Sequence, residues 1–86
     1  MRVPETATLR GLLGAVVGAV HESAHPKLYG RLWDLYMGLS ERNGEVSEGD
    51  RRDTIEEVLP FLPQVSGLGA AGYKAVNAFQ AATHTD

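Results

Sequence analysis

The segment 25–44 carries more apolar surface than a helix with a single packing partner needs. At 100° per residue its leucines fall on one narrow stripe, which is typical of a helix packed on a core. The stripe consists of Leu28, Leu32, Leu35 and Leu39. Beside it lie Tyr29, Trp33, Tyr36 and Met37. These four widen the apolar arc to roughly 200°, whereas a surface helix needs about 100°. The helix is therefore either central in a bundle or displays an aromatic strip to a partner.

Three other segments repeat the helical spacing of apolar residues, and none shows the alternation typical of a strand. Segment 5–24 has the stripe Leu9, Leu12, Leu13, Val16, Val17 and Val20. Segment 48–59 and the residues after it give Ile55, Val58, Leu59 and Leu62. The last segment, from residue 66 or 67 to 83, gives Leu68, Ala71, Gly72, Ala75, Val76, Phe79 and Ala82. With the helix from residue 26 or 27 to 42, the sequence predicts an all-α fold, a small bundle of about four helices in one domain spanning 1–86.

Residues that stop or start helices separate these segments. Pro26 divides the first two, because proline disfavours helical geometry at the residue before it. The pair 43–44, Asn-Gly, tolerates a left-handed conformation and is expected to end the second helix. Ser47 is expected to cap the third in a variant of the capping box. The prolines at 60 and 63 predict a rigid corner, with Phe61 and Leu62 tucked beneath it.

Glycines line up on the face of the first helix opposite its core stripe. Gly11, Gly14 and Gly18 each cost about 0.5–1 kcal/mol relative to alanine inside a helix. Such residues permit close approach by another element. Because the inner stripe of the last helix is also made mostly of small residues, we expect these two helices to be in close contact through the glycine face.

Composition narrows the possible partners. The 86 residues include 8 basic and 11 acidic ones, a net charge of −3, which disfavours binding to a nucleic-acid backbone. The longest apolar run, 12–20, is too short for a bilayer, which needs about 20 residues. Glu5 and the lack of a clear cleavage site weigh against a signal peptide. Cysteine is absent, which excludes disulfides and thiolate metal sites. We expect a cytoplasmic protein with no membrane association.

Residues 21–25 read His-Glu-Ser-Ala-His, which resembles the zincin metallopeptidase signature. The resemblance implies His21 and His25 as zinc ligands and Glu22 as the general base. It covers five residues of 86, and Pro26 disrupts the helix that would have to hold both histidines. No spacing marks a third ligand. The sequence therefore favours solvated polar residues at a helix end, with no metal and no cofactor.

No other arrangement of residues predicts catalysis. The acidic pair Glu56-Glu57 and the basic pair Arg51-Arg52 are expected to form one solvated helix face. Serines lie near no obvious base in the sequence. We therefore expect no catalytic residues and no enzyme activity.

The leading hypothesis is a small helical interaction module that binds another protein or a second copy of itself, as an adaptor, an assembly subunit or a stoichiometric inhibitor. The predicted binding residues are Tyr29, Trp33, Tyr36 and Met37, since aromatic anchors dominate the centres of interfaces. One alternative is a metal-binding protein or minimal zinc hydrolase that uses the motif at 21–25. A second alternative, a nucleic-acid-binding regulator, is disfavoured by the acidic charge.

Overall fold

The structure is a computed structural model, and it describes residues 1–23, 25–40 and 45–84. The elements, in chain order, are α1 (Thr6–Glu22), α2 (Pro26–Ser40), α3 (Glu48–Val58), the 3-10 helix η1 (Leu59–Phe61), α4 (Leu62–Ser66) and α5 (Ala70–Thr83). Four of these helices have at least eleven residues, and the described ranges contain no strand. The predicted small all-α bundle is confirmed.

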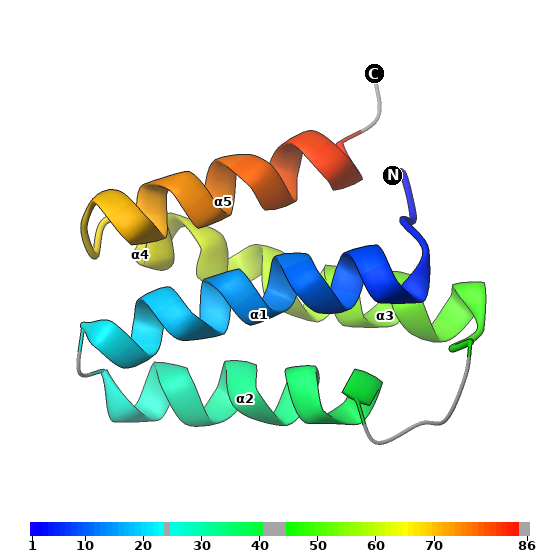
Figure 1. The fold of residues 1–86 in the computed structure, drawn as a ribbon, viewed down its shortest axis with the longest axis horizontal. Coiled ribbons are helices and arrows are strands. Elements are labelled where there is room, and N and C mark those ends of the chain that lie inside the picture. The colour runs from blue at the N-terminus through cyan, green and yellow to red at the C-terminus, as the bar shows by residue number, and fades with distance from the viewer. Residues whose placement is uncertain (24, 41–44, 85–86) are drawn as a thin grey trace.

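Helix α1 lies between α5 and α2 and contacts both (Figure 1). In the same view α3 lies behind α1, and α4 lies between α5 and α1. Helix α4 contacts α1 and α5, and α3 contacts α2. The Cα atoms extend over 31 × 31 × 17 Å, so the molecule is a slab with two broad faces.

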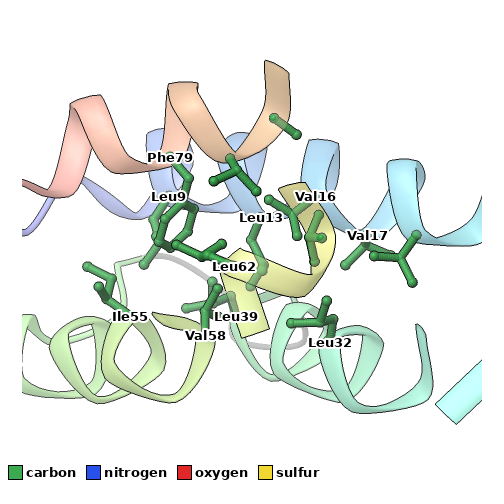
Figure 2. Close-up of a cluster of buried hydrophobic side chains, with 14 of the residues drawn as sticks. Leu9, Leu13, Val16, Val17, Leu32, Leu39, Ile55, Val58, Leu62 and Phe79 are labelled. Atoms are coloured by element: carbon green, nitrogen blue, oxygen red, sulfur yellow. The ribbon is translucent and has the colours of Figure 1, made fainter. Parts of the chain in front are cut away.

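The core fills the space between these helices, and each long helix contributes to it (Figure 2). The fully buried side chains are Leu9, Leu13, Val16, Val20, Leu32, Leu39, Ile55, Val58, Leu62, Val65 and Phe79. The stripe predicted for α1 is confirmed, although Leu12 is only partly buried. The prediction was wrong for Ala71, which is exposed, and for Leu59, which is 40% exposed. At Leu59 the chain tightens into a 3-10 helix, so α-helical spacing no longer identifies the inward side.

The corner predicted at residues 60–63 is itself helical. Pro60 lies in the first turn of η1 and Pro63 in the first turn of α4, where a missing N–H donor costs nothing. Leu62 is buried beneath this corner as expected, and Phe61 is partly buried. The last helix begins at Ala70 rather than at residue 66 or 67. Gly69 precedes it with φ +140°, a conformation that L side chains rarely adopt, and so permits the tight turn from α4 into α5.

The predicted glycine contact between the first and last helices is wrong, although α1 and α5 do touch. A Cβ at Gly14 would lie 3.3 Å from Cε1 of Tyr36, so this glycine faces α2. At Gly11 and Gly18 the space within 4 Å is empty. The small residue of α5 that matters is Gly72, which lies against the backbone of Val65 in α4. The glycines serve two different close approaches, neither of them between α1 and α5.

The N-terminal segment is held by hydrogen bonds to parts of the chain far away in sequence. The amide of Arg2 donates to the carbonyl of Thr83 at 2.9 Å. The hydroxyl of Thr6 accepts the amide of Val46 at 3.0 Å. Arg51 donates from Nη1 to the carbonyl of Pro4 and from Nε to the carbonyl of Val46. These bonds tie the start of the chain to α5 and to the beginning of α3.

Arg51 contradicts the predicted solvated face. Its side chain is 12% exposed, whereas that of Arg52 is 47% exposed and pairs with Glu48. The two arginines are adjacent in sequence, but consecutive residues of a helix point about 100° apart. Of the four residues predicted to form this face, Arg52, Glu56 and Glu57 are exposed and Arg51 is not.

The predicted cap of α3 is present, because the Ser47 Oγ accepts the amide of Asp50 at 3.2 Å. The predicted ends of two other segments lie outside the described residues. These are the second helix beyond residue 40, with the Asn-Gly pair at 43–44, and the tail at 85–86.

Candidate functional site

Three rings of α2 follow one another along the helix, and we call them the aromatic row: Tyr29, Trp33 and Tyr36. The ring centroids of Tyr29 and Trp33 are 5.9 Å apart with the planes 18° from parallel. Those of Trp33 and Tyr36 are 5.8 Å apart at 35°. Such separations lie within the range of favourable aromatic pairs. The rings therefore hold one another in place along the side of the helix.

The row is half-buried, with its middle ring the most open. Trp33 is 39% exposed, while Tyr29, Tyr36 and Met37 are partly buried. Helix α2 lies at one edge of the slab and not at its centre (Figure 1). It nevertheless contacts both α1 and α3, so it packs on two neighbours while Trp33 stays partly exposed. The binding role of the row stays a prediction. The leucine stripe of α2 faces the core, and the row lies beside it.

Contacts with α1 position the two outer rings. Because Gly14 has no side chain, the ring of Tyr36 lies directly against the α1 backbone. The ring of His21, in the last turn of α1, lies 5.1 Å from that of Tyr29. His21 thus extends the row by one ring, a neighbour that sequence reasoning missed. Its only sequence signal was its position on the glycine side of α1.

On α1, the surface beside the row consists of very small residues. Ala7, Gly11, Ala15 and Gly18 are all exposed. Between residues 6 and 20 the one charged residue is Arg10, whose Nη2 donates to the carbonyl of Leu39 at 3.2 Å. This face of α1 therefore carries only very small side chains and no charge.

Charge gathers instead on α3 and on the opposite side of α2. Helix α3 carries five of the eleven acidic residues. The Arg31 and Asp34 side chains of α2 line a hollow with Glu57 and Phe61, so they face α3 and η1. The molecule thus has an uncharged region at α1 and the row, and a charged region around α3.

The structure separates the residues of the His-Glu-Ser-Ala-His motif. Helix α1 ends at Glu22, two residues before the end predicted from the sequence. The hydroxyl of Ser23 donates to the carbonyl of Ala19 at 2.8 Å in the last turn. His25 lies at the start of α2, where its carbonyl accepts the amide of Tyr29. The two histidines therefore do not share a helix, which the zincin signature requires.

His21 and His25 do line one open hollow of about 420 Å³, together with Pro26 and Tyr29. Within residues 1–23, 25–40 and 45–84, no three side chains of the His, Asp or Glu type gather closely enough to hold a metal ion. A structural zinc site needs four ligands, and a catalytic one needs three. The two histidines are thus one ligand short of even a catalytic zinc site.

We expect stoichiometric zinc at micromolar concentration to leave the imidazole NMR signals of His21 and His25 unchanged, because two histidines on separate helices supply too few ligands. The signal of His84, at the other end of the chain, is the internal control. Shifts confined to His21 and His25 at micromolar metal would contradict this expectation and support the metal-binding alternative.

Comparisons of the chain with protein-family models, with curated proteins and with solved structures found no match. Within the described residues, no helix combines the length and the apolar character needed to cross a bilayer. The geometry of the site is therefore the basis for proposing a function.

Proposed function

We propose that the protein is a helical protein–protein interaction module with no catalysis of its own, and that the aromatic row and Met37 form its binding surface. The observation that carries the proposal is the placement of Trp33. The residue is 39% exposed, and its indole lies between two tyrosine rings on an edge helix. A cytoplasmic location is part of the proposal and fits a chain without cysteine.

The chemistry of the row suits the centre of an interface. Trp and Tyr are enriched among the residues that contribute most binding energy, since they combine a large apolar body with a polar tip. Side chains that are free before binding lose about 0.5–1.5 kcal/mol each when an interface immobilises them. Stacking already restrains the three rings of the row, which reduces this cost. The three rings are therefore pre-organised for binding a partner.

The test is a single substitution with a matched control. We expect Trp33→Ala to remove partner binding while the fold persists, because Trp33 is not one of the residues that form the buried core. Tyr73→Ala is the control, since Tyr73 is 59% exposed on α5, on the far side of α1 from α2 (Figure 1). Proteins captured from the source cell by the wild type would be identified by mass spectrometry. Each would be purified and titrated against the wild type and both variants by calorimetry.

Loss of binding in Trp33→Ala but not in Tyr73→Ala supports the proposal. Equal binding by all three proteins would place the interaction elsewhere on the molecule. Circular dichroism before each titration checks the fold. If Trp33→Ala unfolds the domain, the row belongs to the core and the proposal fails.

A further inference from the structure

The aromatic row stands next to a surface whose shape is its complement. Glycine has no side chain, so at Gly11 and Gly18 the surface of α1 lies at the level of the backbone. Beside it, on α2, lie the half-buried rings of the aromatic row, of which Trp33 is 39% exposed. A partly exposed aromatic row and a strip of very small residues therefore run side by side along two neighbouring helices of the same face.

Contacts between α1 and α2 fix which residues stand level with each other. The two helices run antiparallel, and the pairs Gly14–Tyr36 and His21–Tyr29 mark two points along them. Trp33 lies between Tyr29 and Tyr36 on α2. Along the helix axes it is therefore at the same position as Val17 and Gly18 of α1. The most exposed ring of the row therefore has an open glycine beside it at the same height.

A two-fold axis can be drawn in this face, parallel to α1 and α2 and midway between them. Rotation by 180° about this axis exchanges the aromatic row and the Gly11–Gly18 strip. It preserves position along the helices, so the Trp33 of each copy falls on the Gly18 of the other. Contacts of this kind are reciprocal, as a two-fold interface requires.

Charge and area fit such a pairing. The Gly11–Gly18 strip contains no charged residue, and the acidic residues of α3 lie on a helix behind α1, so no like charges meet across the strip itself. The broad face measures 31 × 31 Å between Cα atoms. That size is adequate for a standard interface, which buries roughly 800 Å² on each partner. A domain of this length also buries a small share of its own surface and gains from association.

We propose that this face binds a second copy of the chain, forming a two-fold dimer in which the aromatic row of each copy covers the Gly11–Gly18 strip of the other. The inference rests on the proposed function, because it uses the same row. It adds the identity of the partner and the surface of α1 that receives the indole.

The experiment measures mass by sedimentation velocity from about 1 µM to about 1 mM protein. We expect the wild type to pass from 9.3 kDa to twice that mass. Gly18→Gln should raise the dissociation constant at least tenfold, because the new side chain fills the place of the partner's indole. Gly38→Gln is the matched control. Gly38 is also helical, exposed and without a neighbour within 4 Å, but it lies on the side of α2 that faces α3. It should change the constant by less than about twofold.

Fluorescence of Trp33, the one tryptophan of the chain, provides a second measurement. Its emission should shift to the red as the wild type is diluted, and it should already be red-shifted in Gly18→Gln at high concentration. Gly38→Gln should follow the wild type.

Two outcomes of the sedimentation experiment overturn the dimer. A wild type that stays at 9.3 kDa up to about 1 mM has no such interface. A dimer that Gly18→Gln leaves intact uses another face. Neither outcome decides the proposed function, which the Trp33→Ala and Tyr73→Ala titrations against other proteins test separately. A blue shift of monomeric Trp33 on zwitterionic lipid vesicles would assign the face to a lipid surface and also overturn the dimer.

Discussion

Substituting Gly72 by alanine is expected to destabilise the domain by about 2–3 kcal/mol, despite the higher helix propensity of alanine. A Cβ at this position would lie 2.2 Å from the carbonyl oxygen of Val65 and 3.3 Å from its carbonyl carbon. These are backbone atoms, and the oxygen already accepts the amide of Leu68 at 3.1 Å. No rotation of a side chain relieves the clash. Helix α5 must therefore move away from α4, which opens the core around Phe79 and Val76.

The control is Gly18→Ala, which makes the same chemical change on another helix. No atom lies within 4 Å of a Cβ at Gly18, so this variant gains the helix propensity of alanine, about 0.5–1 kcal/mol, without a clash. Thermal unfolding at low protein concentration should give opposite signs. We expect a melting temperature roughly 10–20 °C lower for Gly72→Ala and a few degrees higher for Gly18→Ala. A Gly72→Ala variant as stable as the wild type would show that α4 and α5 are not packed this closely.

These two glycines also show what periodicity can and cannot predict. Spacing correctly placed Gly72 on the inner side of the last helix and Gly18 on the outer side of the first. Spacing could not show which element each glycine contacts. A glycine packs through its backbone, so the residue that it contacts has no recognisable pattern in the sequence. The contact of Gly14 with a tyrosine ring, and not with the last helix, follows from how the helices pack in three dimensions.

The division of the C-terminal half was missed for a related reason. The sequence predicts a rigid corner at residues 60–63, yet Pro60 and Pro63 both lie in the first turn of a helix, where proline is tolerated. A sequence pattern with two prolines three residues apart fits either a non-helical corner or two short helical turns in succession. Burial of Leu62 and Val65 on the inner side decides between them, and burial depends on the whole fold.

The candidate binding residues come from the sequence alone, and their role stays a prediction. The wide apolar arc of α2 singles out Tyr29, Trp33, Tyr36 and Met37, and in the structure Trp33 is 39% exposed while the other three are partly buried. The arc alone left two placements for the helix, because a half-buried Trp is common both in a core and at a surface. The structure adds what periodicity could not give: α2 lies at the edge of the slab, contacts α1 and α3, and leaves Trp33 as its most exposed ring.

Arg51 gives the second large expected effect. Replacing it by methionine should cost about 2–3 kcal/mol, because hydrogen bonds from a charged group are worth about 1.5–3 kcal/mol when their loss leaves acceptors unpaired. Its guanidinium donates to the carbonyl of Val46 at 3.0 Å and to the carbonyl of Pro4, 47 positions earlier in the chain. Methionine keeps the unbranched apolar stem and therefore isolates the loss of the donors. Urea unfolding of the wild type and the variant measures the difference.

Arg52→Met is the matched control, since Arg52 is 47% exposed and makes an i,i+4 pair with Glu48 at 3.3 Å. Surface pairs of this kind contribute about 0.3–0.5 kcal/mol, so the control should be nearly neutral. An equal loss of stability in Arg51→Met and Arg52→Met would contradict the expectation. It would mean that the hydrogen bonds from Arg51 to the backbone stabilise the fold no more than a surface ion pair does.

The ion pair of Arg51 with Glu45 does not account for the expected loss. The two side chains are 3.6 Å apart, and Glu45 is 68% exposed, so water and salt screen the attraction. We therefore expect Glu45→Gln to change stability by less than about 0.5 kcal/mol. Added salt should also leave the difference between the wild type and Arg51→Met almost unchanged, because carbonyl acceptors carry no net charge. Arg51→Lys should recover only part of the loss, since an ammonium group on one stem cannot reproduce the fixed fork that reaches two carbonyls. A full recovery by lysine, or a difference that disappears in salt, would identify the charge and not the two backbone bonds as the source of stability.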